Sequence, residues 1–388
     1  MRKNLNLMYI ISFLQGLIFY GPVSLIYKIQ KGISVKEAFF LEFFLLMITV
    51  FTEVLWGYFA DKYGYKKTLI ISYFLFFLSR VTLIFCNSFV SFFIETCIRG
   101  ISVSGISGCD IAFLYSSCSE NESEKVFGRY RAYNSTGFFI SSILSVFIVG
   151  KSIELAIFLT SMAYGINVLI MYFTSDVEYK VDKKKESFNL KDSFKDRNLI
   201  KQMLVFVIAT SLICEITYGI TINLSQIHFK NIGFDFKFFG FITAFSELAS
   251  LLSSKTYIFT NKFGQTKTLK FIITSTLIFV FILIFTENII FSIVCIISLS
   301  GLTAMSSPIV LDIQNKFIKK NRATILSIYS MIGNIFAAII NILIGFLADM
   351  YVKYSFMLCF FILLIGVYGV YLYLSKIPKI ETKIIRSK

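Results

Sequence analysis

Residues 61–69 read DKYGYKKTL, and residues 261–269 read NKFGQTKTL. Each of these polar stretches separates two long apolar runs, and the two stretches occupy matching places in the two halves of the chain. A fainter match joins GRYRAYNS at 128–135 to KKNRATILS at 319–327. Matching stretches at matching places indicate an internal duplication. We therefore expect two similar structural halves.

The apolar runs themselves set the fold class. Hydrophobic residues make up 56% of the chain, and the mean hydropathy is +0.75. Runs of about 20 apolar residues recur along the sequence, and this length crosses the hydrocarbon core of a bilayer as a helix. The runs are continuous and do not alternate, which excludes a barrel of transmembrane strands. The sequence thus predicts an all-α polytopic membrane protein.

Twelve spans in two sets of six are expected. The one long stretch too charged to enter lipid lies between the sets, at residues 175–198. It is the natural cytoplasmic linker between an N-terminal six-helix bundle, residues 1–174, and a C-terminal bundle, residues 199–388, which ends in a basic tail. The expected spans are 5–28, 37–60, 68–86, 88–117, 130–150, 152–174, 199–229, 236–260, 268–286, 289–312, 323–347 and 355–375.

Basic residues predict the orientation of these spans. With the N-terminus in the cytoplasm, 28 Lys and Arg residues fall on the cytoplasmic side and seven on the outer side. Positive residues mark cytoplasmic loops, so both termini are expected inside, in a cell membrane. The net charge of +15 is then a topology signal and does not indicate nucleic acid. The basic start and the first apolar run, which lacks a cleavage site, predict an uncleaved first span.

Enzyme and metal sites find little support in the sequence. The seven cysteines form no CxxC pair, and His228 is the only histidine. No HExxH or GxSxG motif occurs, and VGKS at 149–152 lacks the first glycine of a phosphate loop. We expect no catalytic activity, no metal and no cofactor.

Ionisable groups inside apolar spans point to function, because a charge in hydrocarbon is costly. Arg99, Glu215 and Glu247 lie near the middle of their spans. Glu95 and Arg99 share a helix face, so they form either an intrahelical ion pair or a substrate or proton group. Glu215 is either a proton or cation site or a hydrogen-bonded structural residue. Glu247 is a weaker candidate because Lys255 can compensate its charge.

Polar and amphipathic residues on the first and seventh spans are candidates for lining a cavity. They are Gln15, Tyr20, Tyr218, Asn223 and Gln226. Three interpretations of Arg80 in the third span remain open: it pairs with Glu42, it pairs with Glu95, or its side chain extends toward the outer surface.

Several of these stretches resemble a known family. Residues 57–67, GYFADKYGYKK, are similar to the GxxxDxxGRKK signature between the second and third helices of major facilitator superfamily transporters. The fourth span resembles the drug-efflux branch, with Arg99 at the place of its intramembrane arginine. NRATILSIYSMIGN followed by GFLAD is similar to the family's eleventh helix and the loop before it. This chain departs from the pattern at Tyr65, where the signature has arginine, and it lacks the proline-glycine motif of antiporters in the fifth span.

The resemblance implies alternating access, in which two bundles rock about a central site. We expect a conformational latch built from the signature residues and a partner in the fourth span: Gly57, Asp61, Gly64, Lys66, Lys67 and Asp110. Asp61 would lie against the positive N-terminal end of the eleventh helix, near Ala323 and Thr324. Charge exchange with Lys66 or Asp110 would release it. The second copy has Asn261 in place of Asp61, so the latch is expected to be charged on one side only.

Three functions remain open. The first is proton-coupled efflux of small amphipathic or cationic compounds, the second is uptake or facilitated transport of a sugar, peptide or organic anion with Arg99 binding the substrate, and the third is a transporter-like sensor or partner subunit. The expected partners are a small-molecule substrate, protons and the lipid bilayer, and the protein is expected to act as a monomer.

Overall fold

The computed structural model describes residues 2–118, 122–177, 197–316 and 322–385. Every regular element within these residues is a helix. Twelve stretches in the described part of the chain are long and apolar enough to cross a membrane. The predicted all-α fold with twelve spans is therefore confirmed.

Two compact units make up the chain. The first consists of Met1–Lys183 with Phe229–Glu247, and the second of Lys184–His228 with Leu248–Lys388. The linker predicted at 175–198 lies mostly outside the described residues.

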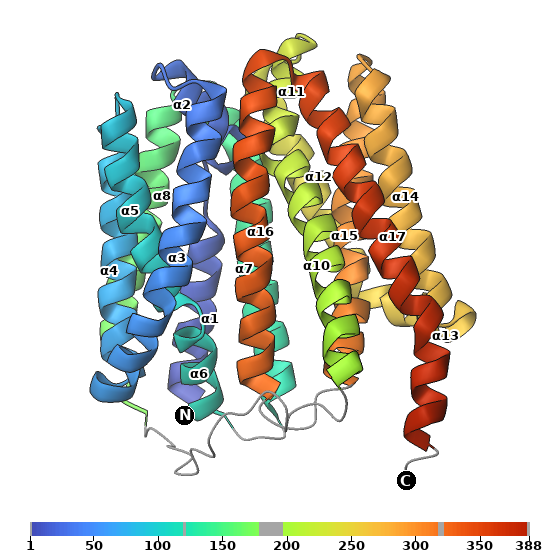
Figure 1. The fold of residues 1–388 in the computed structure, drawn as a ribbon. Helices are drawn as coiled ribbons and strands as arrows, with labels where there is room; N and C mark the ends of the chain where they lie inside the picture. The colour runs from blue at the N-terminus through green and yellow to red at the C-terminus, as the bar shows by residue number, and fades with distance from the viewer. Residues whose placement is uncertain (1, 119–121, 178–196, 317–321, 386–388) are drawn as a thin grey trace. The chain divides into compact units, whose positions relative to one another are not determined.

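The first six spans belong to the first unit, and their helices run side by side along its length (Figure 1). Its main contacts join α1 to α7, α3 to α5, α4 to α5, and α4 to α8. The helices are α1 (Arg2–Gly16), η1 (Gly21–Val23), α2 (Ser24–Gln30), α3 (Val35–Tyr63), α4 (Tyr65–Ile84), α5 (Phe89–Ile106), α6 (Cys109–Ser116), α7 (Ser123–Val149) and α8 (Ile153–Tyr172).

The spans of the second half repeat this pattern. There α10 packs on α16, η5 on α15, α14 on α15, and α14 on α17. The helices are α10 (Arg197–Gly219), η3 (Ile220–Leu224), α11 (Ser225–Asn231), η4 (Phe236–Phe238), α12 (Phe239–Ser250), η5 (Leu251–Lys255), α13 (Thr256–Phe263), α14 (Gln265–Phe285), α15 (Ile289–Lys316), α16 (Arg322–Met350) and α17 (Val352–Ile385). Equivalent spans thus make equivalent contacts in both halves.

The paired sequence motifs adopt the same turn. Gly64 ends α3 with φ +87° and ψ 156°, and Gly264 ends α13 with φ +84° and ψ 149°. Both φ values lie in the region that favours glycine, because a residue with a Cβ atom would be strained in this backbone conformation. In each copy a threonine four residues later, Thr68 or Thr268, donates its hydroxyl to the glycine carbonyl at 2.9 Å. The duplication inferred from sequence is therefore present in the backbone.

Four spans that the apolar runs predict as continuous are interrupted. The first breaks after Gly16, the fourth at Ser107 and Gly108, the seventh contains the π-helix η3, and the eighth contains the 3-10 helix η5. Pro22 explains the first break in part, since it has no N–H to continue a helix. Gly108, with φ +83°, explains the second. Hydropathy misses these breaks because a few residues do not change the polarity of a run.

The crossing of α1 and α7 depends on glycine for a different reason, which is space. A Cβ atom on Gly137 would lie 2.1 Å from the Phe13 carbonyl oxygen, and one on Gly16 would lie 2.1 Å from the Asn134 carbonyl oxygen. The two backbones are therefore in direct contact, as small residues permit between helices in membranes.

Candidate functional site

A cluster of five charged side chains lies within the apolar spans of the first unit. We call it the charged cluster: Lys28 on α2, Glu42 on α3, Arg80 on α4, and Glu95 and Arg99 on α5. Glu42 lies about 10 Å along α3 from its first residue, at 1.5 Å per residue. All five residues lie within stretches that are long and apolar enough to cross a membrane, and charges in such stretches need partners.

Glu42 joins two cations from different helices. Its Oε1 lies 3.0 Å from Lys28 Nζ and 3.2 Å from Arg99 Nη2. The side chains of Glu42 and Arg99 keep exposed fractions of 24% and 17%. Glu42 and Arg99 are thus the least buried members of the cluster.

Glu95 also joins two cations, but its side chain is buried away from solvent. Its Oε1 lies 3.5 Å from Arg99 Nε and 3.6 Å from Arg80 Nη2, and this oxygen makes no hydrogen bond to the described residues. The side chains of Arg80 and Glu95 are only 5% and 2% exposed. Of the interpretations that the sequence left open, the structure shows Arg80 with Glu95, and Arg99 paired both on its own helix and across to Glu42.

Aromatic rings hold Arg80 in place. Its Nη1 donates a hydrogen bond to the Tyr20 hydroxyl, and its guanidinium lies over the Phe76 ring, 4.6 Å from the ring centre. A cation above an aromatic face is attracted by the ring quadrupole. Tyr20, which the sequence predicts to line a cavity, is buried and is a hydrogen-bond partner of Arg80 in the charged cluster.

The break in the first span explains how Tyr20 reaches Arg80. Between α1 and η1 the helical hydrogen bonds stop, and side chains of α8 replace some of them. Tyr164 Oη donates to the Gln15 carbonyl at 2.8 Å. Thr160 Oγ1 accepts a hydrogen bond from the Phe19 amide at 3.0 Å. Irregular backbone at this depth is tolerated in membranes where other protein groups satisfy it.

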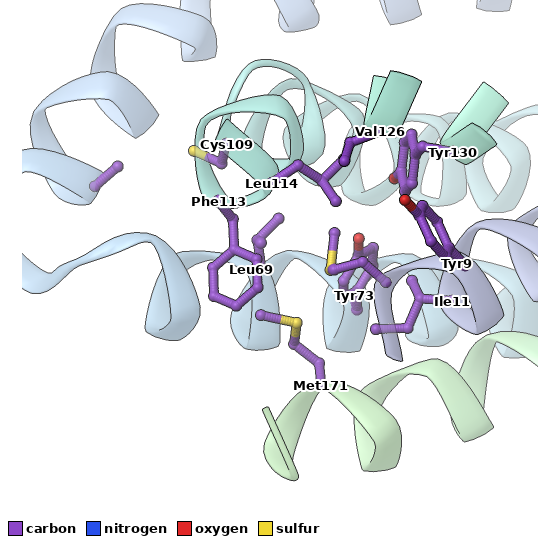
Figure 2. Packing of buried hydrophobic residues seen from close by; sticks show 12 residues of the cluster. Tyr9, Ile11, Leu69, Tyr73, Cys109, Phe113, Leu114, Val126, Tyr130 and Met171 are labelled. Atoms are coloured by element: carbon purple, nitrogen blue, oxygen red, sulfur yellow. The ribbon is translucent and has the colours of Figure 1, made fainter. Parts of the chain in front are cut away.

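A second polar group surrounds Asp110. The Tyr130 hydroxyl donates to Asp110 Oδ2 at 3.0 Å and lies 3.2 Å from Gln15 Oε1. Asp110 reaches this place because α5 ends at Ile106 and α6 starts at Cys109, directly after the break at Ser107 and Gly108. Apolar residues of α1, α4, α6, α7 and α8 pack around Tyr130 and Tyr73, as Figure 2 shows. The structure thus brings together two predicted residues, Gln15 and Asp110.

The other predicted latch residues lie at the turn between α3 and α4. Gly57 and Asp61 are exposed on the last turns of α3, and Lys67 is exposed on α4. Lys66 donates to the Thr174 carbonyl at 2.5 Å, past the end of α8. The residues predicted opposite Asp61, Ala323 and Thr324, have no described side chains.

The candidates of the seventh span cluster around the π-helix η3. Asn223 lies in η3 and is half-buried, whereas Tyr218 is exposed on α10. Gln226 is buried, and its Nε2 donates a hydrogen bond to the Ile222 carbonyl at 2.7 Å. The side-chain amide of Gln226 thus satisfies a backbone carbonyl of the π-helix. π-turns inside α-helices occur frequently at functional sites.

Glu215 precedes this turn by less than two helical turns and is half-buried. Among the described residues it has no hydrogen-bond or ion-pair partner. Glu247 on α12 is also half-buried, and no ion pair joins it to Lys255 in the described part of the chain. Glu215 and Glu247 thus have no ion-pair partner among the described residues, whereas Glu42 and Glu95 each have two.

Four residues of these groups were missing from the predicted site: Lys28, Glu42, Arg80 and Tyr130. Lys28 and Glu42 lie near the ends of apolar runs, where a charge is ordinary and carries no signal. Tyr130 lies in a polar stretch that the sequence marks only as a repeat. Glu42 was considered solely as one possible partner of Arg80.

Twelve apolar helices in two repeats, with charged groups held between the spans, define a membrane transport protein. Residues 5–340 match the family model of the Major Facilitator Superfamily, so the chain belongs to this superfamily. A search of curated proteins found no match.

Solved structures of other transporters have the same fold. The nucleoside transporter NupG is 14% identical with a TM-score of 0.76, covering 95% of this chain and 98% of that one. A D-xylose-proton symporter is 15% identical with a TM-score of 0.74, covering 95% and 97%. The POT family transporter PepTSo is 11% identical with a TM-score of 0.76, covering 98% of both chains. At these identities the likeness establishes the fold, and the narrower resemblance to the drug-efflux branch finds no support here.

Proposed function

We propose that this chain is a secondary active transporter that carries a small polar metabolite across a cell membrane by alternating access. The observation that carries this proposal is the charged cluster inside apolar spans, whose least buried members are Arg99 and Glu42. Charged side chains at such depth usually mark a substrate or ion pathway. Similar folds in transporters named for a nucleoside, for D-xylose with protons and for peptides support a polar solute.

Protons are the proposed coupling ion, and Glu215 is the proposed carrier. A half-buried carboxylate without a basic partner can take up and release a proton, because burial disfavours its charged form. Its place beside the π-helix η3 would connect protonation to the geometry of the seventh span. The basic residues support an orientation with both termini in the cytoplasm. The proposed latch places Asp61 at the cytoplasmic surface.

Proton-coupled efflux of amphipathic or cationic compounds is the second candidate. Glu215 and Glu247 favour it, since acidic groups without ion-pair partners in the described part of the chain would attract a cation. The ion pairs of the first unit favour a polar or anionic solute instead. A transporter-like sensor would show neither flux nor exchange.

Replacing Glu215 by Gln tests the coupling. In proteoliposomes with an imposed pH gradient, the Glu215→Gln variant should lose gradient-driven accumulation, by tenfold or more, but should keep exchange of labelled for unlabelled solute. The physical reason is that an amide cannot carry a proton but keeps the shape and polarity of the site. Glu287→Gln, at an exposed carboxylate, is the matched control and should transport normally. Full gradient-driven accumulation by Glu215→Gln would exclude Glu215 as the coupling residue.

A further inference from the structure

The charged cluster does not balance its own charge. It contains three cations, Lys28, Arg80 and Arg99, and two carboxylates, Glu42 and Glu95. Each carboxylate is already shared between two of the cations. Glu154 is 2.8 Å from Lys31 and belongs to that separate pair. Counted over the described residues, the cluster therefore has one positive charge in excess.

An uncompensated charge of this kind is unfavourable inside apolar spans. The side chain of Lys28 is 11% exposed, and that of Arg80 is 5% exposed. Water therefore screens the excess charge poorly, and an anion entering the cluster would be attracted more strongly than at an open surface. The excess charge favours an anionic ligand over a cationic or a neutral one.

Arg99 is the residue that can receive this anion. Its Nη2 faces Glu42 and its Nε faces Glu95, whereas its Nη1 donates to no acceptor among the described residues. A guanidinium group presents paired N–H donors that match the two oxygens of a carboxylate or phosphate. Arg80 cannot take this role, because it is sealed by Tyr20, Phe76 and Glu95.

We propose that the exposed end of the charged cluster binds an oxyanion, a carboxylate or phosphate group, and that the transported metabolite is a small organic anion. This inference rests on the proposed function and names the substrate class of the same site. Arg99 supplies the donors, and Lys28 supplies the unbalanced charge. Glu42 sets the affinity, because it already offsets part of the positive charge.

Binding is measured with the purified full chain, as the rise in apparent melting temperature with acetate or inorganic phosphate at constant ionic strength. Chloride is the third probe, since it carries charge but cannot accept two parallel hydrogen bonds. We expect acetate or phosphate to stabilise the chain at lower concentrations than chloride does. Equal effects of all three anions would overturn the proposal, because they would indicate general screening.

Two substitutions with opposite expected signs separate binding from structure. Lys28→Met removes the excess charge and should weaken oxyanion binding about tenfold, whereas Glu42→Gln adds to it and should strengthen binding about tenfold. Both variants break the same ion pair, so a purely structural role would change both in the same direction. Lys31→Met, which breaks the neighbouring pair with Glu154, is the control and should bind normally.

The same measurements distinguish this inference from the proposed function. Transport of an uncharged solute without oxyanion binding would overturn the inference and leave the transporter proposal intact. Oxyanion binding with the expected signs, but with no flux and no exchange in proteoliposomes, would contradict the transporter proposal instead. Weakened binding in both Lys28→Met and Glu42→Gln would also overturn the inference.

Discussion

At the scale of single residues, the first unit depends on positions where no other side chain fits. Gly137 and Gly128 lie on the same helix, α7, yet their surroundings differ completely. A Cβ atom on Gly137 would meet the Phe13 carbonyl oxygen at 2.1 Å, whereas nothing lies within 4 Å of one on Gly128. Glycine at 137 is therefore required by packing, and glycine at 128 is not.

This difference predicts opposite effects of the same substitution. Gly137→Ala should destabilise the protein by about 1 to 3 kcal/mol, because it forces α1 and α7 apart. Gly128→Ala should be neutral or stabilising by up to about 1 kcal/mol, because alanine is the better helix residue. The apparent melting temperatures of the two purified variants provide the comparison. A Gly137→Ala variant as stable as Gly128→Ala would show that the crossing is looser than described.

At the scale of elements, hydrogen bonds to side chains of α8 stabilise the irregular backbone that interrupts the first span. Tyr164 contributes its hydroxyl, and Tyr172, which is exposed on the same helix, contributes nothing to the break. Tyr164→Phe should cost about 1 to 3 kcal/mol, because it leaves the Gln15 carbonyl without this donor. Tyr172→Phe is the matched control and should be nearly neutral. If both variants melt at the native temperature, the hydroxyl of Tyr164 does not support the break.

Sequence reasoning was reliable for the helices and weak for their irregularities. The spans follow from runs of apolar residues, since only a helix satisfies its own backbone in lipid. The break after Gly16 depends on hydrogen-bond partners on α8, such as Thr160, whose Oγ1 accepts from the Phe19 amide. That information lies far along the chain and has no periodic signal.

The same limit applies to the site. Arg99 and Glu95 were predicted because their charges stand out in apolar runs and their spacing places them on one helix face. Glu42 is 57 residues from Arg99, and only the packing of α3 on α5 brings the two together. The charge excess of the cluster is therefore a property of the fold and could not be counted from the sequence.

At the scale of the whole molecule, a duplicated backbone carries two different sets of charges. Gly64 and Gly264 form the same turn, and equivalent spans make equivalent contacts. Glu42 and Glu95 in the early spans belong to a cluster of ion pairs, whereas Glu215 and Glu247 in the later spans have no ion pair to any described residue. Asp61 in the first motif corresponds to Asn261 in the second. The two halves thus share a backbone pattern but differ in their charged residues.

The central claim is that Arg99 binds the solute that this transporter carries. Its most direct test is the uptake of radiolabelled small carboxylates, phosphate esters, nucleosides, sugars and peptides by proteoliposomes containing the native chain or the variants Arg99→Lys and Arg99→Gln. For the solute that the native chain accumulates, we predict a loss of at least tenfold in Arg99→Lys, which keeps the charge but not the paired donors, and a complete loss in Arg99→Gln. Insertion and melting temperature of each variant serve as controls for folding. Native uptake by a folded Arg99→Gln variant would contradict the claim.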